Sequence, residues 1–211
     1  MLRRPLIAAL ALAVVVQSAL AAQTGTGPQT PPPDPKPRPD LVRYPYNAAD
    51  VEFMQGMIPH HAQAIVMAGW APSHGAGKDI LLMSERMLVS QRDEIVWMRN
   101  WLRDRSQFVP AANATHHKMK MAGGMEHDML MPGMLTADEL AQLDKARGKD
   151  FDRLFLTFMT RHHEGALKMV DDMFASPGAM QDEDVYAFVS DIYADQTAEI
   201  ERMQKMLAGG K

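Results

Sequence analysis

Apolar residues recur three and four positions apart along most of the second half of the chain and part of the first, which predicts amphipathic helices. Asn47 with Asp50, and Thr136 with Glu139, are N-terminal capping pairs that open two of them. The expected spans are about 47–69, 78–105, 137–146, 150–175 and 182–207. Four long helices predict an all-α protein, most simply an antiparallel four-helix bundle running up-down-up-down.

Pro59 lies inside the first predicted helix. A proline has no backbone N–H, so the carbonyl of Gln55 loses its usual helical partner. This predicts either a kink at Pro59 or a helix that restarts there.

Two motifs occur twice in the same order, which indicates duplication of a helical hairpin. The first is Met-x-x-His-His, at Met57, His60 and His61 and again at Met159, His162 and His163. The second is Gln-x-x-Glu-Ile-x-x-Met, at Gln91, Glu94, Ile95 and Met98 and again at Gln196, Glu199, Ile200 and Met203. The two hairpins are expected over about 47–105 and 149–208. With the first and third long helices parallel on opposite corners, the His pairs would lie at similar heights and face one core.

The repeated motifs predict a metal site. On a helix, positions i, i+3 and i+4 share a face, so Met57 can lie beside His60 and His61. Thioether and imidazole together suit a soft monovalent metal such as Cu(I). Met98 and Met203 could contribute from the partner helices. Glu94 and Glu199 could either orient the imidazoles or hydrogen-bond to neighbouring glutamines.

The connection over 106–135 matches neither a helix nor a strand. Connections of this length are usually functional or unstructured. Gly123, Gly124, Pro132 and Gly133 are expected to keep it flexible, so its methionines are not explained as core filling. Its candidate metal ligands are His116, His117, Met119, Met121, Met125, His127, Met129, Met131 and Met134.

Composition supports soft-metal chemistry and excludes several other classes. The 211 residues include 19 Met and no Cys, which rules out disulfides, thiolate zinc sites and catalytic thiols. The formal net charge of -4, without a basic patch, argues against a nucleic-acid partner.

The N-terminus has the pattern of an export signal. Arg3 and Arg4 precede an apolar run, and Ala19-Leu20-Ala21 gives a cleavage site, so residues 1–22 are interpreted as a signal peptide. An uncleaved membrane anchor is the alternative. Residues 23–40 are a proline-rich linker, and 41–211 form the bundle domain. The protein is therefore expected to be periplasmic or secreted.

The segments FMQGMIPHHAQAIVMA and FLTFMTRHHEGALKMV, with the PGML run between them, resemble the domain of unknown function family 305. That family includes the CopM-like periplasmic copper-binding proteins. The resemblance covers about residues 47–208. It implies a ferritin-like bundle, export, and copper or silver binding through Met and His. By match, the ligand role falls on Met57, His60, His61, Met159, His162 and His163.

The sequence thus predicts an exported protein that captures Cu(I), with Ag(I) and Cu(II) left open, for sequestration, resistance or delivery to a copper-transfer partner. One alternative is a copper-dependent oxidase of the cuprous oxidase type on the same bundle. A di-iron oxidase is disfavoured because the chain has no Glu-x-x-His motif. A metal-free, Met-rich interaction module is the third interpretation.

Overall fold

The computed structural model describes residues 45–120 and 126–209, which belong to one compact unit, and the side chains of 117–128 lie outside this description. The predicted signal peptide and the whole of the predicted linker also lie outside it. The elements are α1 (Ala48–Trp70), α2 (Lys78–Asp104), β1 (His117–Lys120), β2 (Glu126–Met129), α3 (Ala137–Lys145), α4 (Gly148–Phe174) and α5 (Glu183–Leu207). The predicted all-α class is confirmed, with one short hairpin as the exception, and each observed helix begins and ends within two residues of the predicted position. None of the described helices is long and apolar enough to cross a membrane.

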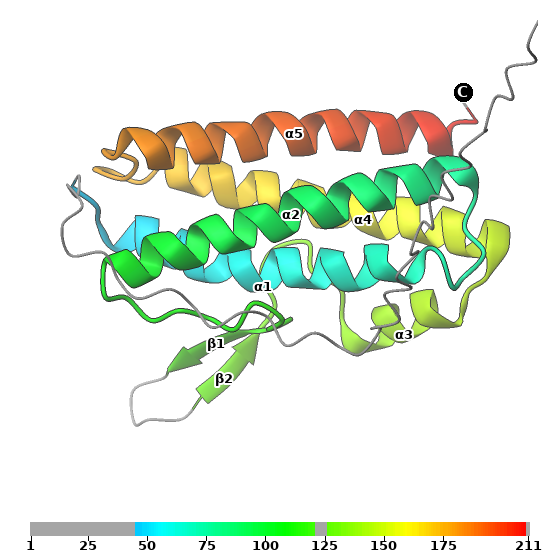
Figure 1. The fold of residues 1–211 in the computed structure, drawn as a ribbon, viewed down its shortest axis with the longest axis horizontal. Coiled ribbons are helices and arrows are strands. Elements are labelled where there is room, and N and C mark those ends of the chain that lie inside the picture. The colour runs from blue at the N-terminus through cyan, green and yellow to red at the C-terminus, as the bar shows by residue number, and fades with distance from the viewer. Residues whose placement is uncertain (1–44, 121–125, 210–211) are drawn as a thin grey trace, which may run out of the picture. The chain divides into compact units, whose positions relative to one another are not determined.

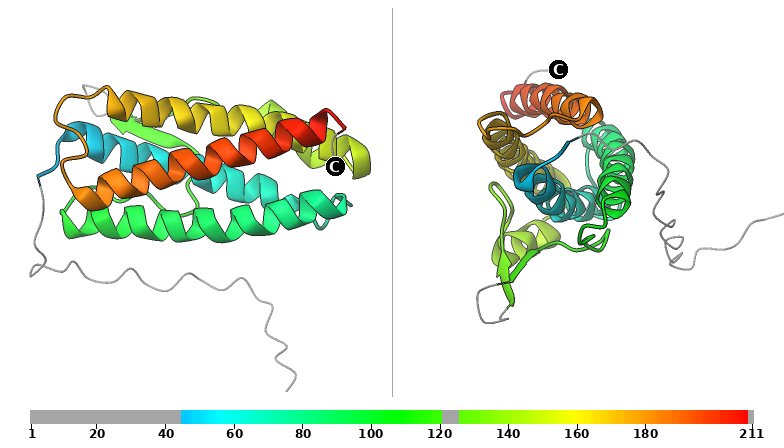
Figure 2. Two further views of the ribbon diagram at one scale, coloured as in Figure 1. Left: turned by 90° about the horizontal axis from the view of Figure 1, so that it is seen from above. Right: turned by 90° about the vertical axis from the view of Figure 1, so that its left-hand side faces the viewer.

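Four long helices lie side by side, and the chain direction alternates between neighbours (Figures 1 and 2). The ends of α1 and α4 show their relative direction. The Asn47 side chain, which caps the start of α1, donates to the Pro177 carbonyl just beyond the end of α4 at 3.1 Å. At the other end, the Gly148 N–H that opens α4 donates to the His74 carbonyl beyond α1 at 2.8 Å. Helices α1 and α4 are therefore antiparallel neighbours.

The predicted up-down-up-down course, with α1 and α4 parallel on opposite corners, is wrong. Helix α4 begins at the end of the bundle where α1 finishes, and α2 finishes at the opposite end (Figure 1). The connection between α2 and α4 has to travel the length of the bundle, roughly 40 Å for helices of this size. Its unusual length makes this course possible, and it allows α4 to pack directly on α1.

Helix α1 runs without interruption through Pro59, so the predicted restart at that residue is wrong. Asn47 and Asp50 form the expected capping box at its start, as Thr136 and Glu139 do for α3.

The core consists of two hydrophobic clusters, one toward each end of the bundle. One contains Met57, Met98 and Trp101, and the other contains Met159 and Met203. Equivalent residues of the two repeats thus lie at opposite ends. A buried polar layer lies between the clusters, and its members are His60, His61, Gln63, Gln91, His162, His163 and Gln196.

The connection contains a short β-hairpin, which the sequence interpretation missed. Strands β1 and β2 pair antiparallel, with His117 opposite Met129 and Met119 opposite His127. Four-residue strands are too short to give a clear alternating pattern, since two or three positions decide the period. The hairpin leads into residues 130–136, which run along α1 and α4 (Figure 2).

The segment before α3 is fastened to the bundle and is not the flexible loop that Pro132 and Gly133 predicted. Gln63 of α1 accepts from the Leu135 N–H at 2.7 Å and donates to the Leu135 carbonyl at 3.0 Å. Gly133 has φ +79°, and a Cβ there would lie 2.9 Å from the His162 carbonyl oxygen. The glycine is therefore required for close approach to α4.

Replacing Gly165 with Ala is expected to destabilise the protein by about 1–3 kcal/mol, because its Cβ would overlap the Pro132 carbonyl group. Gly69→Ala is the matched control, since no heavy atom lies within 4 Å of its added Cβ. That helical substitution should be neutral or stabilising by up to about 1 kcal/mol. Urea unfolding followed by tryptophan fluorescence measures both. Equal stability of the two variants would contradict the close contact.

Candidate metal centre

The two His pairs meet at the middle of the α1–α4 contact. The ring centroids of His60 and His162 are 3.8 Å apart. His61 and His163 flank them, at 6.4 Å from His60 and 6.2 Å from His162. All four side chains are at most 1% exposed. The convergence of the two pairs on one core position is therefore present, although the helices that carry them are antiparallel.

A carboxylate closes each end of this row of rings. Nε2 of His61 is hydrogen-bonded to Glu94 of α2, and Nε2 of His163 is hydrogen-bonded to Glu199 of α5 at 2.6 Å. Of the two roles left open for these glutamates, contact with the imidazoles is the one observed. We call the row Glu94–His61–His60–His162–His163–Glu199 the imidazole array.

The hydrogen bonds of the array determine which ring nitrogens are free. His60 donates from Nε2 to the Pro132 carbonyl at 3.0 Å, and the carboxylates accept from the Nε2 atoms of His61 and His163. The Nδ1 atoms of these three residues are buried without a well-formed hydrogen bond among the described residues. Both ring nitrogens of His162 are in the same condition. Unpaired buried nitrogens with available lone pairs fit metal ligation, and partners on the opposite nitrogen fix the tautomer.

Burial keeps the central rings neutral. Removal from water, with a smaller contribution from the charges of His61 and His163, lowers the pKa of His60 from 6.5 to about 3. The same burial, together with the neighbouring His60, holds the pKa of His162 well below its ordinary value. Neutral imidazole is the form that binds metals, so both rings are ready to ligate at neutral pH.

Thioethers lie on both sides of the array. Met57 and Met159 precede the His pairs on their helices by one turn and are fully buried, as are Met98 and Met203. Because Met57 and Met159 belong to opposite hydrophobic clusters, one sulfur is available from each end of the bundle. Within the described residues, no three His, Asp or Glu side chains surround a single point closely enough to hold an ion by themselves.

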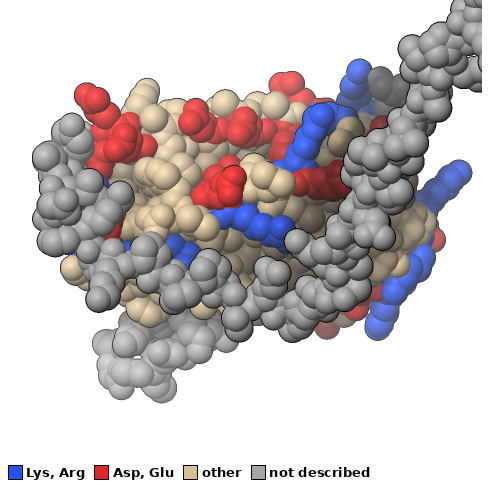
Figure 3. Space-filling model, in the orientation of Figure 1, with Lys and Arg blue, Asp and Glu red and all other residues tan. Residues whose placement is uncertain are grey.

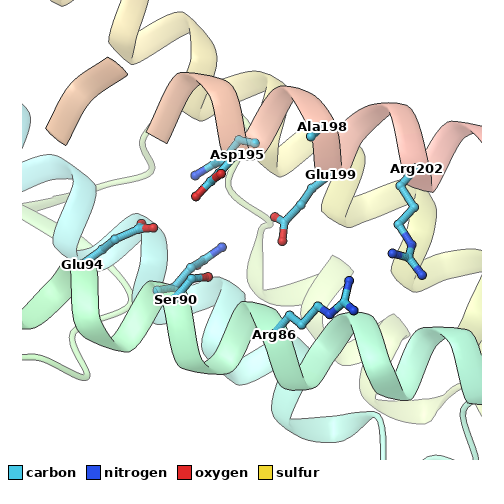
Figure 4. Close-up of a pocket in the computed structure, with 9 residues that line it drawn as sticks. Arg86, Ser90, Glu94, Asp195, Ala198, Glu199 and Arg202 are labelled. Atoms are coloured by element: carbon cyan, nitrogen blue, oxygen red, sulfur yellow. The ribbon is translucent and has the colours of Figure 1, made fainter. Parts of the chain in front are cut away.

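The outer side of the array faces a groove of about 360 Å³ between α2 and α5. Glu94, Asp195 and Glu199 point into it from the two facing helices (Figure 4). Acidic side chains are also spread along α5 on this face (Figure 3). Burial and the nearby Glu94 and Glu199 raise the pKa of Asp195, as expected where like charges gather. Arg86 and Arg202 also line the groove, so its three carboxylates exceed its two guanidinium groups by one negative charge.

The candidate ligands in the connection are not collected at one place. Met134 is buried, Met131 is half-buried against the core, and Met129 and His116 are exposed. The prediction that none of these methionines fills the core is thus wrong for Met131 and Met134. Met121 and Met125 lie outside the described residues, as do the side chains of His117, Met119 and His127.

His74, which was not among the candidate ligands, has a structural role. Its Nε2 donates to the Asp144 carbonyl at 2.9 Å, and its ring stacks on Trp70. It fastens the turn after α1 to α3.

Comparison with known proteins identifies the family. The profile of the domain of unknown function family DUF305 matches residues 50–207. The chain belongs to this family. No curated protein matches it.

Three solved structures show the same fold. A DUF305 protein from Streptomyces coelicolor is 23% identical with a TM-score of 0.63, covering 77% of this chain and 95% of its own. A DUF305 fragment from Deinococcus radiodurans is 24% identical with a TM-score of 0.62, covering 78% and 98%. CopM in its Cu(II)-bound form is 25% identical with a TM-score of 0.57, covering 76% and 96%.

The sequence analysis missed the backbone contact of the imidazole array. The Pro132 carbonyl that binds His60 comes from a residue 72 positions away, in a segment predicted to be flexible. The one available signal was Gly133 next to Pro132, which was interpreted as flexibility although glycine equally permits close packing.

The apo protein is expected to lose stability as the pH falls below 6.5. In the unfolded chain His60 and His162 take up protons near pH 6.5, whereas in the folded protein they remain neutral until far lower pH. The contribution of these two histidines to the free energy of unfolding is complete above pH 6.5. For His60 it is lost progressively down to about pH 3. Between pH 7 and 5 the loss should be roughly 2–4 kcal/mol.

Urea unfolding at several pH values measures the slope of the free energy of unfolding against pH. The His60→Gln/His162→Gln variant should have a shallower slope than the wild type by up to about two protons. His116→Gln is the control, because that side chain is exposed. An identical slope in the double variant would show that the buried rings do not cause the pH dependence.

Proposed function

We propose that this protein is an exported copper-binding protein that holds Cu(I) in its bundle through imidazole and thioether ligands. The observation that carries the proposal is the imidazole array, in which buried rings present unpaired Nδ1 atoms beside buried methionines. Such unpaired groups cost roughly 1–3 kcal/mol each, so a bound ion that satisfied them would also stabilise the fold. The ligands we propose are Met57, His60, His61, Met159, His162 and His163, with Met98 and Met203 in the adjacent clusters as further donors.

The comparison with CopM supports a metal-binding role. That protein has been solved with Cu(II) bound and shares 25% of its residues with this chain over most of both lengths. Structures of CopM with Cu(I) and with Ag also share this fold. The ligand chemistry in this chain favours the monovalent ions, because neutral thioethers and imidazoles are soft donors without charge.

Binding is favoured over catalysis by the burial of the array. A redox reaction on an organic substrate or with oxygen needs an accessible position at the metal. All four imidazoles are at most 1% exposed. Sequestration, or slow transfer to a partner protein, suits such a site better than turnover. Absence of oxygen consumption by the Cu(I)-loaded protein would support this, and steady turnover would favour the oxidase alternative.

The β-hairpin supports a second role for the connection in metal capture. Successive positions of a strand alternate between the two faces of a hairpin. The register pairs position 117 with 129 and position 119 with 127, so these four positions belong to one face. All four are His or Met in this chain, whereas the other face has the positions of Lys118, Lys120, Glu126 and Asp128. We propose that His116, His117, Met119, Met121, Met125, His127 and Met129 capture ions for the bundle.

Anaerobic Cu(I) titration against a competing chelator tests the bundle site. The variant with His60, His61, His162 and His163 all changed to Gln should lose the tightest site, because every imidazole of the array is removed. His74→Gln is the matched control, since it is also a buried histidine but lies outside the array. Unchanged affinity and stoichiometry in the fourfold variant would refute the bundle site, and loss on deleting residues 116–129 instead would place it in the hairpin.

The carboxylates at the ends of the array are expected to tune affinity without ligating. Glu94→Gln/Glu199→Gln removes the charged acceptors that orient His61 and His163, which should weaken Cu(I) binding roughly 10–100-fold at unchanged stoichiometry. Glu164→Gln, on the exposed face of α4, serves as the control. An affinity equal to that of the control would mean that these hydrogen bonds only stabilise the fold.

A further inference from the structure

A small groove near the array is lined by three methionine side chains. It has a volume of about 220 Å³ and lies between the start of α1, the end of α4 and the segment before α3. The methionines are Met131 in the connection, and Met169 and Met173 one turn apart on α4. We propose that this methionine trio binds a soft monovalent cation, Cu(I) or Ag(I), at a site distinct from the imidazole array.

Gly56 of α1 allows two of the three side chains to converge. The methyl carbon of Met131 lies 2.7 Å, and that of Met169 3.3 Å, from the position that a Cβ of residue 56 would occupy. Both side chains therefore end over the same bare stretch of helix backbone. A larger residue at position 56 would have to displace Met131 and crowd Met169, so the glycine is a structural condition for their approach.

The trio is not fully accounted for as core packing. Met169 and Met173 belong to one hydrophobic cluster and Met131 packs against it, yet all three also line a groove that their side chains leave unfilled. Methionine is the most adaptable core residue and normally fills irregular gaps. Three adaptable side chains around a remaining space indicate a position for a ligand that thioethers can hold.

The chemistry of the groove selects a soft, singly charged ion. Thioether sulfurs are neutral, so three of them stabilise Cu(I) or Ag(I) far better than a hard divalent ion. Glu52 and Asp172 lie at the edge of the groove. Asp172 is paired with Lys168 at 2.9 Å, whereas the exposed Glu52 supplies negative charge that attracts a cation.

The groove of the methionine trio lies next to the imidazole array. Pro132 lines the groove, and its carbonyl oxygen accepts the hydrogen bond from His60 at 3.0 Å. One backbone segment therefore lies between the methionine trio and the imidazole array. Resting on the proposed function, this places the trio where an ion can be held before it reaches His60. Ion binding by the trio itself does not depend on that role.

Methyl NMR of the exported protein, with its methionines labelled at the methyl carbon, tests the site during titration with Ag(I). The methyl signals of Met131, Met169 and Met173 should shift together. The Met131→Leu/Met169→Leu/Met173→Leu variant should bind about one Ag(I) fewer per chain, since leucine keeps the volume but removes the sulfur. The matched control is Met83→Leu/Met87→Leu/Met206→Leu, which changes three methionines of the opposite cluster and should keep the full stoichiometry.

Two further measurements make the outcome decisive. Gly56→Ala should weaken Ag(I) binding at the trio by about tenfold or more through displacement of Met131, even though no sulfur is removed. In the variant with four array histidines changed to Gln, the trio signals should still shift, which separates this site from the bundle site. Trio signals that stay unchanged at Ag(I) saturation of the wild type would overturn the proposal, and this measurement needs no variant to fold.

Discussion

The rest of the structure depends on the burial of four imidazoles in one layer across a helical bundle. A neutral imidazole has one donor and one acceptor, and in a dry core each must find a partner or cost free energy. The bundle supplies acceptors for three of the donors, from Glu94, Glu199 and the Pro132 carbonyl. The remaining lone pairs stay unpaired among the described residues. Imidazoles with only one nitrogen hydrogen-bonded contribute less to stability than fully bonded ones would. Their unpaired nitrogens remain free to bind a ligand.

The connection between the two hairpins shapes the site as much as the helices do. It travels the length of the bundle, which makes α1 and α4 antiparallel neighbours and brings His60 against His162. The segment also packs Gly133 against Gly165, and this places the Pro132 carbonyl within hydrogen-bond distance of His60. Its short helix α3 is held by Arg161, which forms two hydrogen bonds to Glu139 at 2.6 and 2.9 Å. Arg161 occupies the position that Pro59 has in the other repeat, so the two halves contact the connection through different residues at this position.

Helix positions and the repeated Met-x-x-His-His motif were predictable from the sequence, because periodicity, capping pairs and short repeats are local patterns. The relative direction of α1 and α4 was not. It depends on the course of the connection, whose described part before α3 is positioned by contacts with the bundle, such as those of Leu135 with Gln63. The same holds for the methionine groove, since Met131 and Gly56 become neighbours only once the chain is folded. Pro59 predicted a possible helix restart, but the helix continues on both sides of this residue.

The reversal of α4 relative to α1 bears on how such a protein could arise. Equivalent residues of the two repeats lie at opposite ends of the bundle, yet His60 and His162 touch at its centre, as the same residue of two chains does beside a twofold axis. Two free copies of a single hairpin could therefore assemble the whole array as a symmetric homodimer. Fusion of the two hairpins would then have added the connection between them. In a single chain the two His pairs could afterwards acquire different neighbours.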